Sequence, residues 1–320
     1  MAVGRSVYKE MNRLRLRTPA KLNLLLDITG KRPDGYHMVR MIMQTIAIHD
    51  ELLFEKTDGS GVTFRVEDRY SALHGAESPI PADDRNLVLR AVRLLSDTPE
   101  RFSGLSVTLT KHIPSQAGMG GGSSDAAAAL IGLNRLYELG LTEEELAARA
   151  LMLGADVPFF LKGGTCLAEG VGEQLTMLPA LHLPHLLIVK PEAGLSTKLV
   201  YETYDSCPPA YHPDTEAFLR ALSGTDALSD TFLSTICETM GNVMEEAAFS
   251  IAPEVRKVRD LLRTEGASAA LMTGSGSAVF GVFRDEETAL SARKTIAREM
   301  PETCQELTAS TEFGVEELPV

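Results

Sequence analysis

Apolar and polar residues alternate along the first part of the chain in a way that predicts strands. Over residues 20–28 three leucines share one face and mostly polar residues the other, which is the period of a half-buried strand. The turn residues Pro33, Asp34 and Gly35 follow, and residues 38–48 form a second extended run. Two extended runs joined by such a turn predict neighbouring antiparallel strands.

Further along, the pattern switches between the strand and helix periods. The first half predicts strands at residues 62–66 and 105–110, helices at residues 86–95, 123–137 and 142–153, and a loop at residues 70–84. The second half predicts strands at residues 165–168, 186–190, 269–272 and 278–283, and helices at residues 196–204, 216–222, 231–249, 253–264 and 286–298. Strands that precede helices without strict alternation favour an α+β sandwich over a doubly wound sheet. Gly163 and Gly164 mark the expected boundary between two domains, residues 1–163 and 164–320, each with its own core.

Composition narrows the choice of partners. The 320 residues carry 31 Lys and Arg against 44 Asp and Glu, so the net charge is −13. We therefore expect no generic binding to nucleic acid or anionic lipid, and an anionic ligand needs a locally built site. No apolar stretch approaches the roughly 20 residues that span a bilayer. Four widely spaced cysteines without a CxxC pair suit free thiols, so we expect a cytoplasmic protein, with a flexible leader at residues 1–10.

The strongest local signal is a glycine cluster between a predicted strand and an Ala-rich helix, at residues 113–125. Glycines let successive backbone N–H groups turn into one concavity. The following helix, with Ser123 and Ser124 as its cap and first-turn residues, adds free N–H donors and the positive end of its dipole. The segment therefore predicts a phosphate cradle, against the alternative of a flexible surface loop.

Two better-known glycine motifs do not fit this cluster. A P-loop requires Gly-Lys-Ser or Gly-Lys-Thr, and the chain contains neither,. A Rossmann fingerprint requires G-x-G-x-x-G, which neither the glycines at 118 and 120 nor those at 274 and 276 complete. The phosphate site is therefore expected to have a rarer architecture.

Three segments together carry a family resemblance. Residues 19–24 (PAKLNL), 114–126 (PSQAGMGGGSSDA) and 273–278 (TGSGSA) resemble the three ordered motifs of the GHMP small-molecule kinases. Residues 32–37 (RPDGYH) and 154–160 (GADVPFF) resemble the branch of this family that acts on a CDP-linked methylerythritol. The resemblance runs from about residue 18 to residue 283. Segments near residues 70–81 and 206–229 diverge from it.

This resemblance implies a two-domain fold. The N-terminal domain would be like ribosomal protein S5 domain 2, the C-terminal domain an αβ sandwich, and ATP would lie in a cleft at the glycine loop. The implied reaction is ATP-dependent phosphorylation of the 2-hydroxyl of the methylerythritol unit, in the non-mevalonate pathway to isopentenyl diphosphate. Other GHMP kinases, acting on homoserine, mevalonate or a sugar, remain alternatives, as does a non-enzymatic RNA-binding module. We expect a monomer or weak homodimer.

Two residues are expected to be catalytic. The resemblance makes Asp156 the base that accepts the proton of the acceptor hydroxyl, with Lys21 holding it ionised and offsetting phosphoryl charge. Lys21 and Asn23 project from one strand face, so both could line one wall of a site. The alternatives are that Lys21 is a solvated strand residue and that Asp156 merely caps a helix.

The remaining expected site residues bind the two substrates. For the CDP-linked acceptor, the resemblance implies His37 hydrogen-bonding to cytosine, Tyr36 and Tyr201 stacking on it, and Thr197 and Asn23 nearby, although Tyr201 could equally be a core residue. For ATP it implies Asn86 and Lys111 near the adenine, where either could be ordinary polar surface, and the loop and first turn at Pro114, Gly118, Gly120, Gly121, Gly122, Ser123 and Ser124.

Metal is expected only as Mg²⁺ carried by ATP, through phosphate oxygens and water, near Ser124. His182 and His185 form an H-x-x-H pair, but Pro184 interrupts any helix that would align the two rings. No third ligand falls at zinc spacing. We therefore predict no protein metal site.

Overall fold

A computed structural model describes residues 11–74, 79–96, 98, 101–223 and 230–320. The expected leader, residues 1–10, lies outside the described residues. The strands are β1 (Arg13–Lys31), β2 (His37–Lys56), β3 (Val62–Asp68), β4 (Leu105–Lys111), β5 (Thr165–Glu169), β6 (Gln174–Met177), β7 (Leu186–Lys190), β8 (Gly241–Asn242), β9 (Ala269–Met272), β10 (Val279–Val282), β11 (Cys304–Thr308) and β12 (Glu316–Leu318).

The helices lie against the sheets that these strands form. They are α1 (Arg69–Leu73), α2 (Leu87–Leu95), α3 (Gly121–Leu136), α4 (Glu143–Leu153), α5 (Val157–Lys162), α6 (Thr197–Ser206), α7 (Thr215–Leu222), α8 (Asp230–Thr239), α9 (Glu245–Ile251), α10 (Pro253–Thr264) and α11 (Glu286–Glu299). The mixture of helices and sheets confirms the predicted α+β class.

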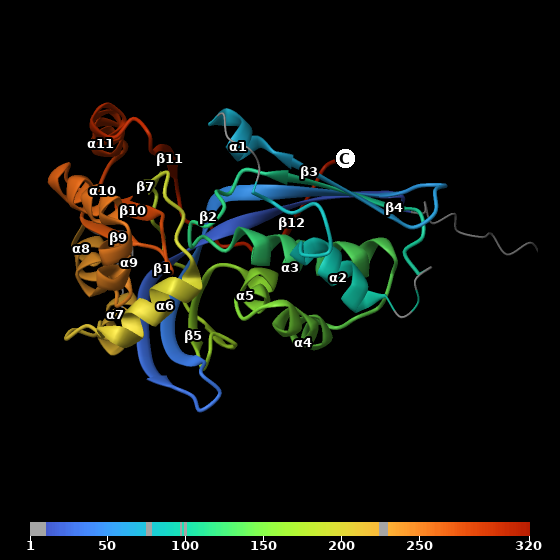
Figure 1. Ribbon diagram of the computed structural model, residues 1–320, viewed down its shortest axis with the longest axis horizontal. Coiled ribbons are helices and arrows are strands. Elements are labelled where there is room, and N and C mark those ends of the chain that lie inside the picture. Colours follow the sequence, from blue (N-terminus) through green and yellow to red (C-terminus); the bar gives the residue numbers. More distant parts are fainter. Residues whose placement is uncertain (1–10, 75–78, 97, 99–100, 224–229) are drawn as a thin grey trace, which may run out of the picture.

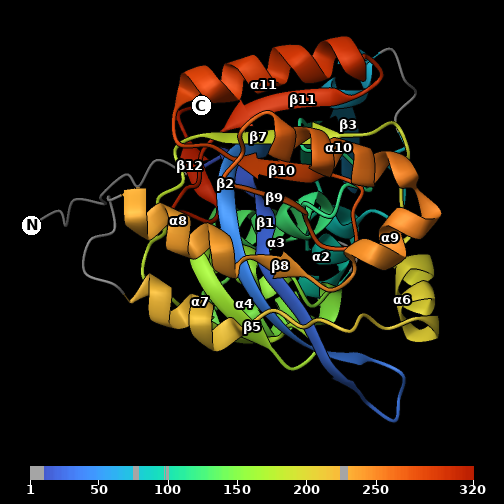
Figure 2. The ribbon, with the colours of Figure 1, turned by 90° about the vertical axis from the view of Figure 1, so that its left-hand side faces the viewer.

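Two sheets form the framework (Figures 1 and 2). The larger has the order β12-β1-β2-β4-β3, with β5 paired to β2, β6 to β5, and β8 to β1. The smaller has the order β11-β7-β10-β9. The long antiparallel strands β1 and β2 run across both halves of the molecule in Figure 1. Their pairing register shifts between Asn23 and Leu25, so the ladder is irregular next to the predicted site residues.

Helix α3 is the central packing element of the first half. It contacts β1 and β2 on one side and α2, α4 and α5 on others. The alanines at 126–129 are fully buried, and a Cβ at Gly132 would lie 2.6 Å from the Phe54 ring. Small side chains therefore let this helix approach the sheet closely, which fixes where its N-terminus lies.

The smaller sheet carries α10 and α11, which pack on its strands as Figure 2 shows. The predicted boundary at residue 163 is crossed by the larger sheet, because β5, β6, β8 and β12 from the second half pair into it. The main hydrophobic core also includes residues from both halves. The expectation of a separate core for the second half was therefore wrong.

Several elements differ from the sequence predictions. Residues 69–73 form α1 within a segment expected to be a loop, with Asp68 accepting a hydrogen bond from the Ser71 N–H as its cap. The single helix expected over residues 231–249 is split, because Gly241 and Asn242 leave the helix and pair with β1. Strands β6, β11 and β12 were not predicted. β6 is short and largely exposed, and β12 is set by its pairing with β1, so local pattern alone carries little signal for them.

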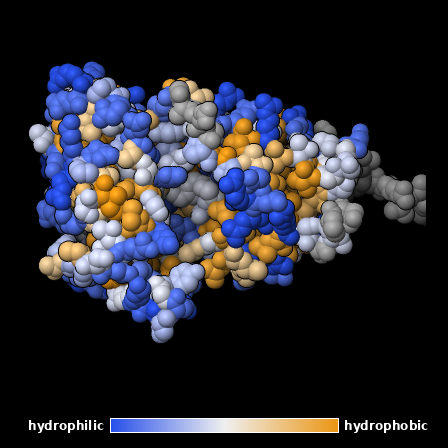
Figure 3. Space-filling model, viewed as in Figure 1, coloured by the Kyte–Doolittle hydropathy of each residue, from blue (hydrophilic) through white to orange (hydrophobic). Residues whose placement is uncertain are grey.

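No helix within the described ranges is long and apolar enough to cross a membrane. On the face in Figure 3, hydrophobic residues gather over the half that carries α2, α3 and α4, whereas hydrophilic residues dominate the other half.

Candidate active site

The glycine loop connects β4 to α3 and is shaped by positive φ angles. Gly118 and Gly120 have φ angles of 73° and 74°, which L-residues with a side chain rarely adopt. A Cβ at Gly118 would lie 2.1 Å from the Thr273 carbonyl oxygen, and one at Gly120 would lie 2.7 Å from the Phe160 ring. Both glycines are therefore required by close packing as well as by backbone conformation.

Backbone hydrogen bonds join this loop to the other two family motifs. The Lys21 N–H donates to the Met119 carbonyl at 3.0 Å, which ties the loop to β1. The Ala278 N–H donates to the Ala117 carbonyl at 3.2 Å, which ties it to the segment before β10. Motifs far apart in sequence thus meet at one point.

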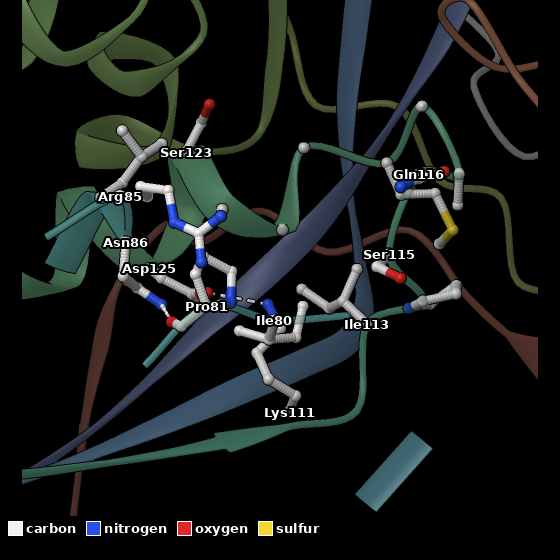
Figure 4. Close-up of a pocket in the computed structure, with 18 residues that line it drawn as sticks. Ile80, Pro81, Arg85, Asn86, Lys111, Ile113, Ser115, Gln116, Ser123 and Asp125 are labelled. Carbon is white, nitrogen blue, oxygen red and sulfur yellow. Dashed lines mark hydrogen bonds and ion pairs between the residues drawn. The ribbon is translucent and has the colours of Figure 1, made fainter. Parts of the chain in front are cut away.

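A first cavity of about 340 Å³ opens beside the loop (Figure 4). Its lining includes the predicted ATP residues Asn86, Lys111, Pro114, Gly118, Gly120, Gly121, Gly122 and Ser123, together with Ile80, Pro81, Arg85, Leu87, Ile113, Ser115, Gln116, Ala117, Met119 and Asp125. The cavity therefore combines apolar walls with the N-terminus of α3, a combination suited to a base and its phosphates.

The N-terminus of α3 differs in detail from the prediction. The cap position is Gly120 in left-handed conformation, with no side-chain cap, and the helix begins at Gly121. Ser123 and Ser124 are therefore first-turn residues and not caps. The uncapped N–H groups of this turn are left for a ligand.

Ser124 does not line the first cavity. Its side chain is fully buried, and its hydroxyl donates to the Pro19 carbonyl at 2.6 Å and lies 2.5 Å from the Thr18 hydroxyl. In this conformation Ser124 fastens α3 to β1, whereas Ser123 faces the cavity.

Lys111 is held in a buried ion-pair cluster with two acids. Its ammonium donates to Asp50 and, at 2.7 Å, to Asp125, the contact drawn in Figure 4. Asp50 also accepts from the backbone N–H groups of His112 and Ile113, at 2.6 and 2.9 Å. The cluster therefore fixes the strand end that leads into the glycine loop.

Two acids share one cation in this cluster. Burial is the largest influence on the Lys111 pKa and lowers it, but the two carboxylates together raise the pKa above its usual value. Burial raises the pKa of Asp125 well above its usual range, against the opposing effect of Lys111. Lys111 therefore stays protonated, and the two acids satisfy its charge without a ligand, whereas Oδ1 of Asp125 is buried without a hydrogen-bond partner.

Asn86 lines the cavity with its polar atoms already engaged. Its side-chain oxygen accepts from the Val88 N–H at 2.9 Å as the cap of α2, and its amide nitrogen donates to the Pro81 carbonyl at 2.8 Å. Asn86 thus positions the cavity wall.

A second cavity of about 330 Å³ lies across the glycine loop and shares Gly118 and Gly120 with the first. Its lining includes the predicted residues Lys21, Asn23, Asp156, Thr197 and Tyr201, together with Leu26, Val39, Met41, Ala155, Val171, Met244, Gly274 and Ser275. The sequence predictions for catalysis and for acceptor binding therefore converge largely on one cavity.

Lys21 and Asp156 face each other in this second cavity. The Lys21 ammonium lies 4.0 Å from an Asp156 carboxylate oxygen and donates to the side-chain oxygen of Asn23. Burial lowers the pKa of Lys21, and the Asp156 charge partly offsets this. The Asp156 side chain is 32% exposed, so its carboxylate is open to the cavity while the ammonium is enclosed.

Asp156 does not act as a helix cap. It precedes α5, but its side chain makes no capping hydrogen bond. Pro158 in the first turn of α5 also removes one of the N–H groups that a cap would satisfy,. The capping alternative considered for Asp156 is therefore not what this structure contains.

Thr197 begins α6 and contacts the third motif. Its hydroxyl lies 2.9 Å from that of Ser275.

Asn242 also holds the third motif. Its side-chain amide donates to the carbonyls of Met272 and Gly274, both at 2.8 Å. Asn242 was missed by the sequence reading because it was assigned to a continuous helix.

His37 and Tyr201 pack against each other, with ring centroids 4.7 Å apart. The His37 Nε2 lies 2.6 Å from an Asp205 oxygen, and Asp205 also accepts from Lys31 at 2.5 Å. Burial, followed by the charge of Asp156, raises the pKa of Tyr201 to about 12. Asp205 therefore orients the His37 ring. The sequence offered one signal for this role, which is that Asp205 lies near the end of α6, next to Tyr204.

Tyr36 lies apart from this aromatic pair. It is 65% exposed and lines a third cavity with Arg32, Asp34 and Met152. Tyr36 and Tyr201 therefore do not face each other across one cavity in this conformation.

The residues that sequence reasoning missed are mostly buried acids. Asp125 lines the first cavity and Asp50 lies behind it on Lys111, whereas the more exposed Asp205 lies at His37. An acid inside an otherwise apolar extended run was the available signal for Asp50, and Asp125 directly follows the glycine-serine motif.

The comparisons with known proteins agree with this geometry. Residues 86–164 match the GHMP kinases N terminal domain, and residues 226–302 match the GHMP kinases C terminal domain. The fold is shared with homoserine kinase from Cytophaga hutchinsonii, at 18% identity and a TM-score of 0.68, over 99% of this chain and all of that one.

Proteins that are more similar in sequence than the homoserine kinase share one name, 4-diphosphocytidyl-2-C-methyl-D-erythritol kinase. The 4-diphosphocytidyl-2-C-methyl-D-erythritol kinase of Lachnospira eligens is 38% identical over 301 residues, 94% of this chain and 99% of the relative. That of Geobacillus kaustophilus is 40% identical and covers 86% of this chain and 89% of its own. A crystal structure of 4-(cytidine 5'-diphospho)-2C-methyl-D-erythritol kinase is 33% identical, covers 93% of this chain and all of that one, and has a TM-score of 0.71. With two cavities meeting at a glycine loop and relatives of this identity over nearly its whole length, the chain belongs to the 4-diphosphocytidyl-2-C-methyl-D-erythritol kinases of the GHMP kinase superfamily.

Proposed function

We propose that ATP occupies the first cavity, that the CDP-linked methylerythritol occupies the second, and that the γ-phosphoryl group passes between them to the 2-hydroxyl. The chain is an ATP-dependent kinase of the non-mevalonate isoprenoid pathway. The observation that carries the assignment of the two cavities is their shared wall, Gly118 and Gly120. Two substrates placed there would meet at the N-terminus of α3.

Asp156 accepts the hydroxyl proton as the oxygen attacks phosphorus and the bond to the leaving ADP oxygen breaks. Its partly exposed carboxylate, 4.0 Å from the Lys21 ammonium, supports this role. The carboxylate orients the hydroxyl and takes the proton late, as in other phosphoryl transfers. Lys21 offsets the negative charge on the transferring group.

The phosphates are held by the first-turn N–H groups of α3 and by the glycine loop. Lys111 contributes indirectly, by fixing the loop through its buried acids. Mg²⁺ carried by ATP would supply further charge neutralisation at the phosphates. Ser123 is the α3 hydroxyl that lines the cavity, whereas the Ser124 hydroxyl is already engaged, so Ser123 fits as a neighbour of the ion better than Ser124 does.

Cytosine binding falls to His37 and the aromatic residues near it. The ring of His37, oriented by Asp205, and Tyr201 supply polar and stacking contacts on one side. The exposed Tyr36 supplies a second stacking surface once its loop approaches the base. His37 and Tyr36 would then contact a base that homoserine and mevalonate do not carry, which would make the site selective for the CDP-linked acceptor.

The environment of the protein is also inferred. The four cysteines are all free thiols, and Cys166 and Cys237 are buried. Unpaired thiols and a net charge of −13 support a reducing, cytoplasmic location and a monomer or weak homodimer without nucleic-acid partners.

A direct assay tests the function. The purified chain is incubated with Mg·ATP and 4-diphosphocytidyl-2-C-methyl-D-erythritol, and the phosphorylated product is detected by mass. Homoserine, mevalonate and a sugar serve as competing acceptors. Ready turnover of one of these, with no product from the CDP-linked acceptor, would refute the assignment.

A further inference from the structure

A cavity of about 400 Å³ lies beside the nucleotide cavity and shares Pro114 with it. It forms where α1 and the first sheet meet β7 and β11 of the second, elements that also lie near one another in Figure 1. It is lined by Ile48, Tyr70, Leu73, His74, His112, Pro114, Ile188, Lys190, Cys304, Gln305 and Glu306. The residues assigned to catalysis and to cytosine binding line neither this cavity nor its rim.

Lys190 is the unusual residue in this cavity. It is 7% exposed and lies opposite Cys304 in the strand pairing. Its ammonium donates to the carbonyls of Pro191 and Ala193, at 2.7 and 3.1 Å. Within the part of the chain that the structure describes, no carboxylate lies within ion-pair distance of it, although Glu192 is close enough to influence it weakly.

A buried ammonium without an acidic partner is costly to maintain. Burial lowers the pKa of Lys190, and the nearby Cys304 and Glu192 offset this only in part. An anion placed in the cavity would supply the missing charge. Because the chain as a whole is acidic, an anion site requires donors gathered at one place, and the lining of this cavity provides them.

Further donors surround the ammonium. Burial and the Cys304 thiol raise the pKa of Tyr70, so its hydroxyl stays protonated and can donate. The rings of His74 and His112 also line the cavity. Among the described residues that line the cavity, the acid is Glu306, whose pKa is raised by burial against the opposing effects of nearby His49 and Arg293. Several donors arriving from different elements suit the oxygens of a phosphate group.

Apart from Cys304 and Gln305, the remaining lining is apolar. Ile48, Leu73, Pro114 and Ile188 form a surface beside the donors, which a nucleotide phosphate or an inorganic anion would leave uncovered. We propose that this cavity binds a small phosphate or diphosphate ester that carries a short apolar chain. The phosphate contacts Lys190, Tyr70 and His112, and the chain lies against Ile188 and Leu73.

Calorimetry on the full chain tests this proposal, with the active site saturated by a non-hydrolysable ATP analogue and the CDP-linked acceptor. The probe is isopentenyl diphosphate, and inorganic diphosphate and the uncharged alcohol isopentenol are its controls. We expect the ester to bind at least about tenfold more tightly than either control, because each control keeps only one half of the interaction. Equal binding of ester and inorganic diphosphate, or no ester binding at millimolar concentration, would overturn the proposal.

Variants locate the site. Lys190→Met should abolish ester binding, whereas Lys198→Met, whose side chain is 85% exposed on α6, should not change it. Leu73 is 80% exposed at the rim, so Leu73→Glu should fold normally and weaken ester binding by about tenfold through like-charge repulsion. Leu73→Gln is its uncharged control. Ester binding that is unaffected by both Lys190→Met and Leu73→Glu, or that appears only without the ATP analogue, would place the ligand elsewhere and refute the inference.

Discussion

Replacing Asp156 by Asn removes the proposed proton acceptor and keeps nearly the same side-chain volume. The side chain makes no capping hydrogen bond and is 32% exposed, so the substitution removes little that stabilises the fold. The contact with Lys21 at 4.0 Å is a partly solvated ion pair, for which a loss of about 1 kcal/mol or less in the free energy of unfolding is expected. A folded variant is therefore expected.

The effect on turnover should be much larger than the effect on stability. An amide cannot accept the hydroxyl proton, and we expect kcat to fall by about 10² to 10⁴. This corresponds to about 2.7 to 5.4 kcal/mol in the activation free energy. Both substrates should still bind, because Asp156 does not line the nucleotide cavity and the cytosine contacts lie at His37 and Tyr201.

The assay measures kcat and both KM values with Mg·ATP and the CDP-linked acceptor, with thermal unfolding as the control for folding. Lys21→Met should cause a comparable loss, and the double variant should be little worse than either single variant, because the two residues act as one unit. Near-normal turnover by folded Asp156→Asn would refute the catalytic role. Strictly additive losses would refute the coupling of the pair.

The pH profile of a residually active Asp156→Asn gives an independent check. Burial lowers the pKa of Lys21 and the Asp156 charge raises it. If the protonated ammonium is required, activity is lost as the pH rises through the Lys21 pKa. Removing the Asp156 charge lowers that pKa further, so the alkaline decline should move to lower pH than in the wild type. An unmoved or upward-shifted decline would contradict the electrostatic link.

Other substitutions test the rest of the site. Gly122→Val should raise the Kd for ADP at least about tenfold in a folded protein, because Gly122 lines the cavity and a Cβ there would meet only Leu87, at 3.7 Å,; unchanged affinity by calorimetry would argue against the phosphate cradle. His37→Ala should raise the acceptor KM far more than the ATP KM, and an equal effect on both would indicate a structural histidine. Lys111→Met should lower the unfolding midpoint at neutral pH by leaving Asp50 and Asp125 buried without their cation, a loss of about 3 to 5 kcal/mol; a midpoint at or above that of the wild type would contradict this reading.

Local pattern was sufficient for many elements. The strand at residues 20–28, the helix at residues 142–153 and the glycine cluster before α3 are all properties of short segments, and each was found where it was predicted. The strand was expected to be half-buried, but residues 18–28 of β1 are buried on both faces, because elements of both halves of the chain cover them. The helix at residues 231–249 failed because Gly241 and Asn242 pair with β1, and the energy of that pairing is not contained in the local segment.

The sequence by itself determined the chemistry that the site could hold, because Lys21, Asp156 and the loop glycines are identifiable by type and motif. The tertiary structure alone decided how these residues are used. It gave Lys111 two buried acids, turned Ser124 toward β1, and paired His37 with Asp205. These partners lie 14 to 168 positions apart along the chain. Ion pairing and burial depend on distance in space, which only the folded chain defines.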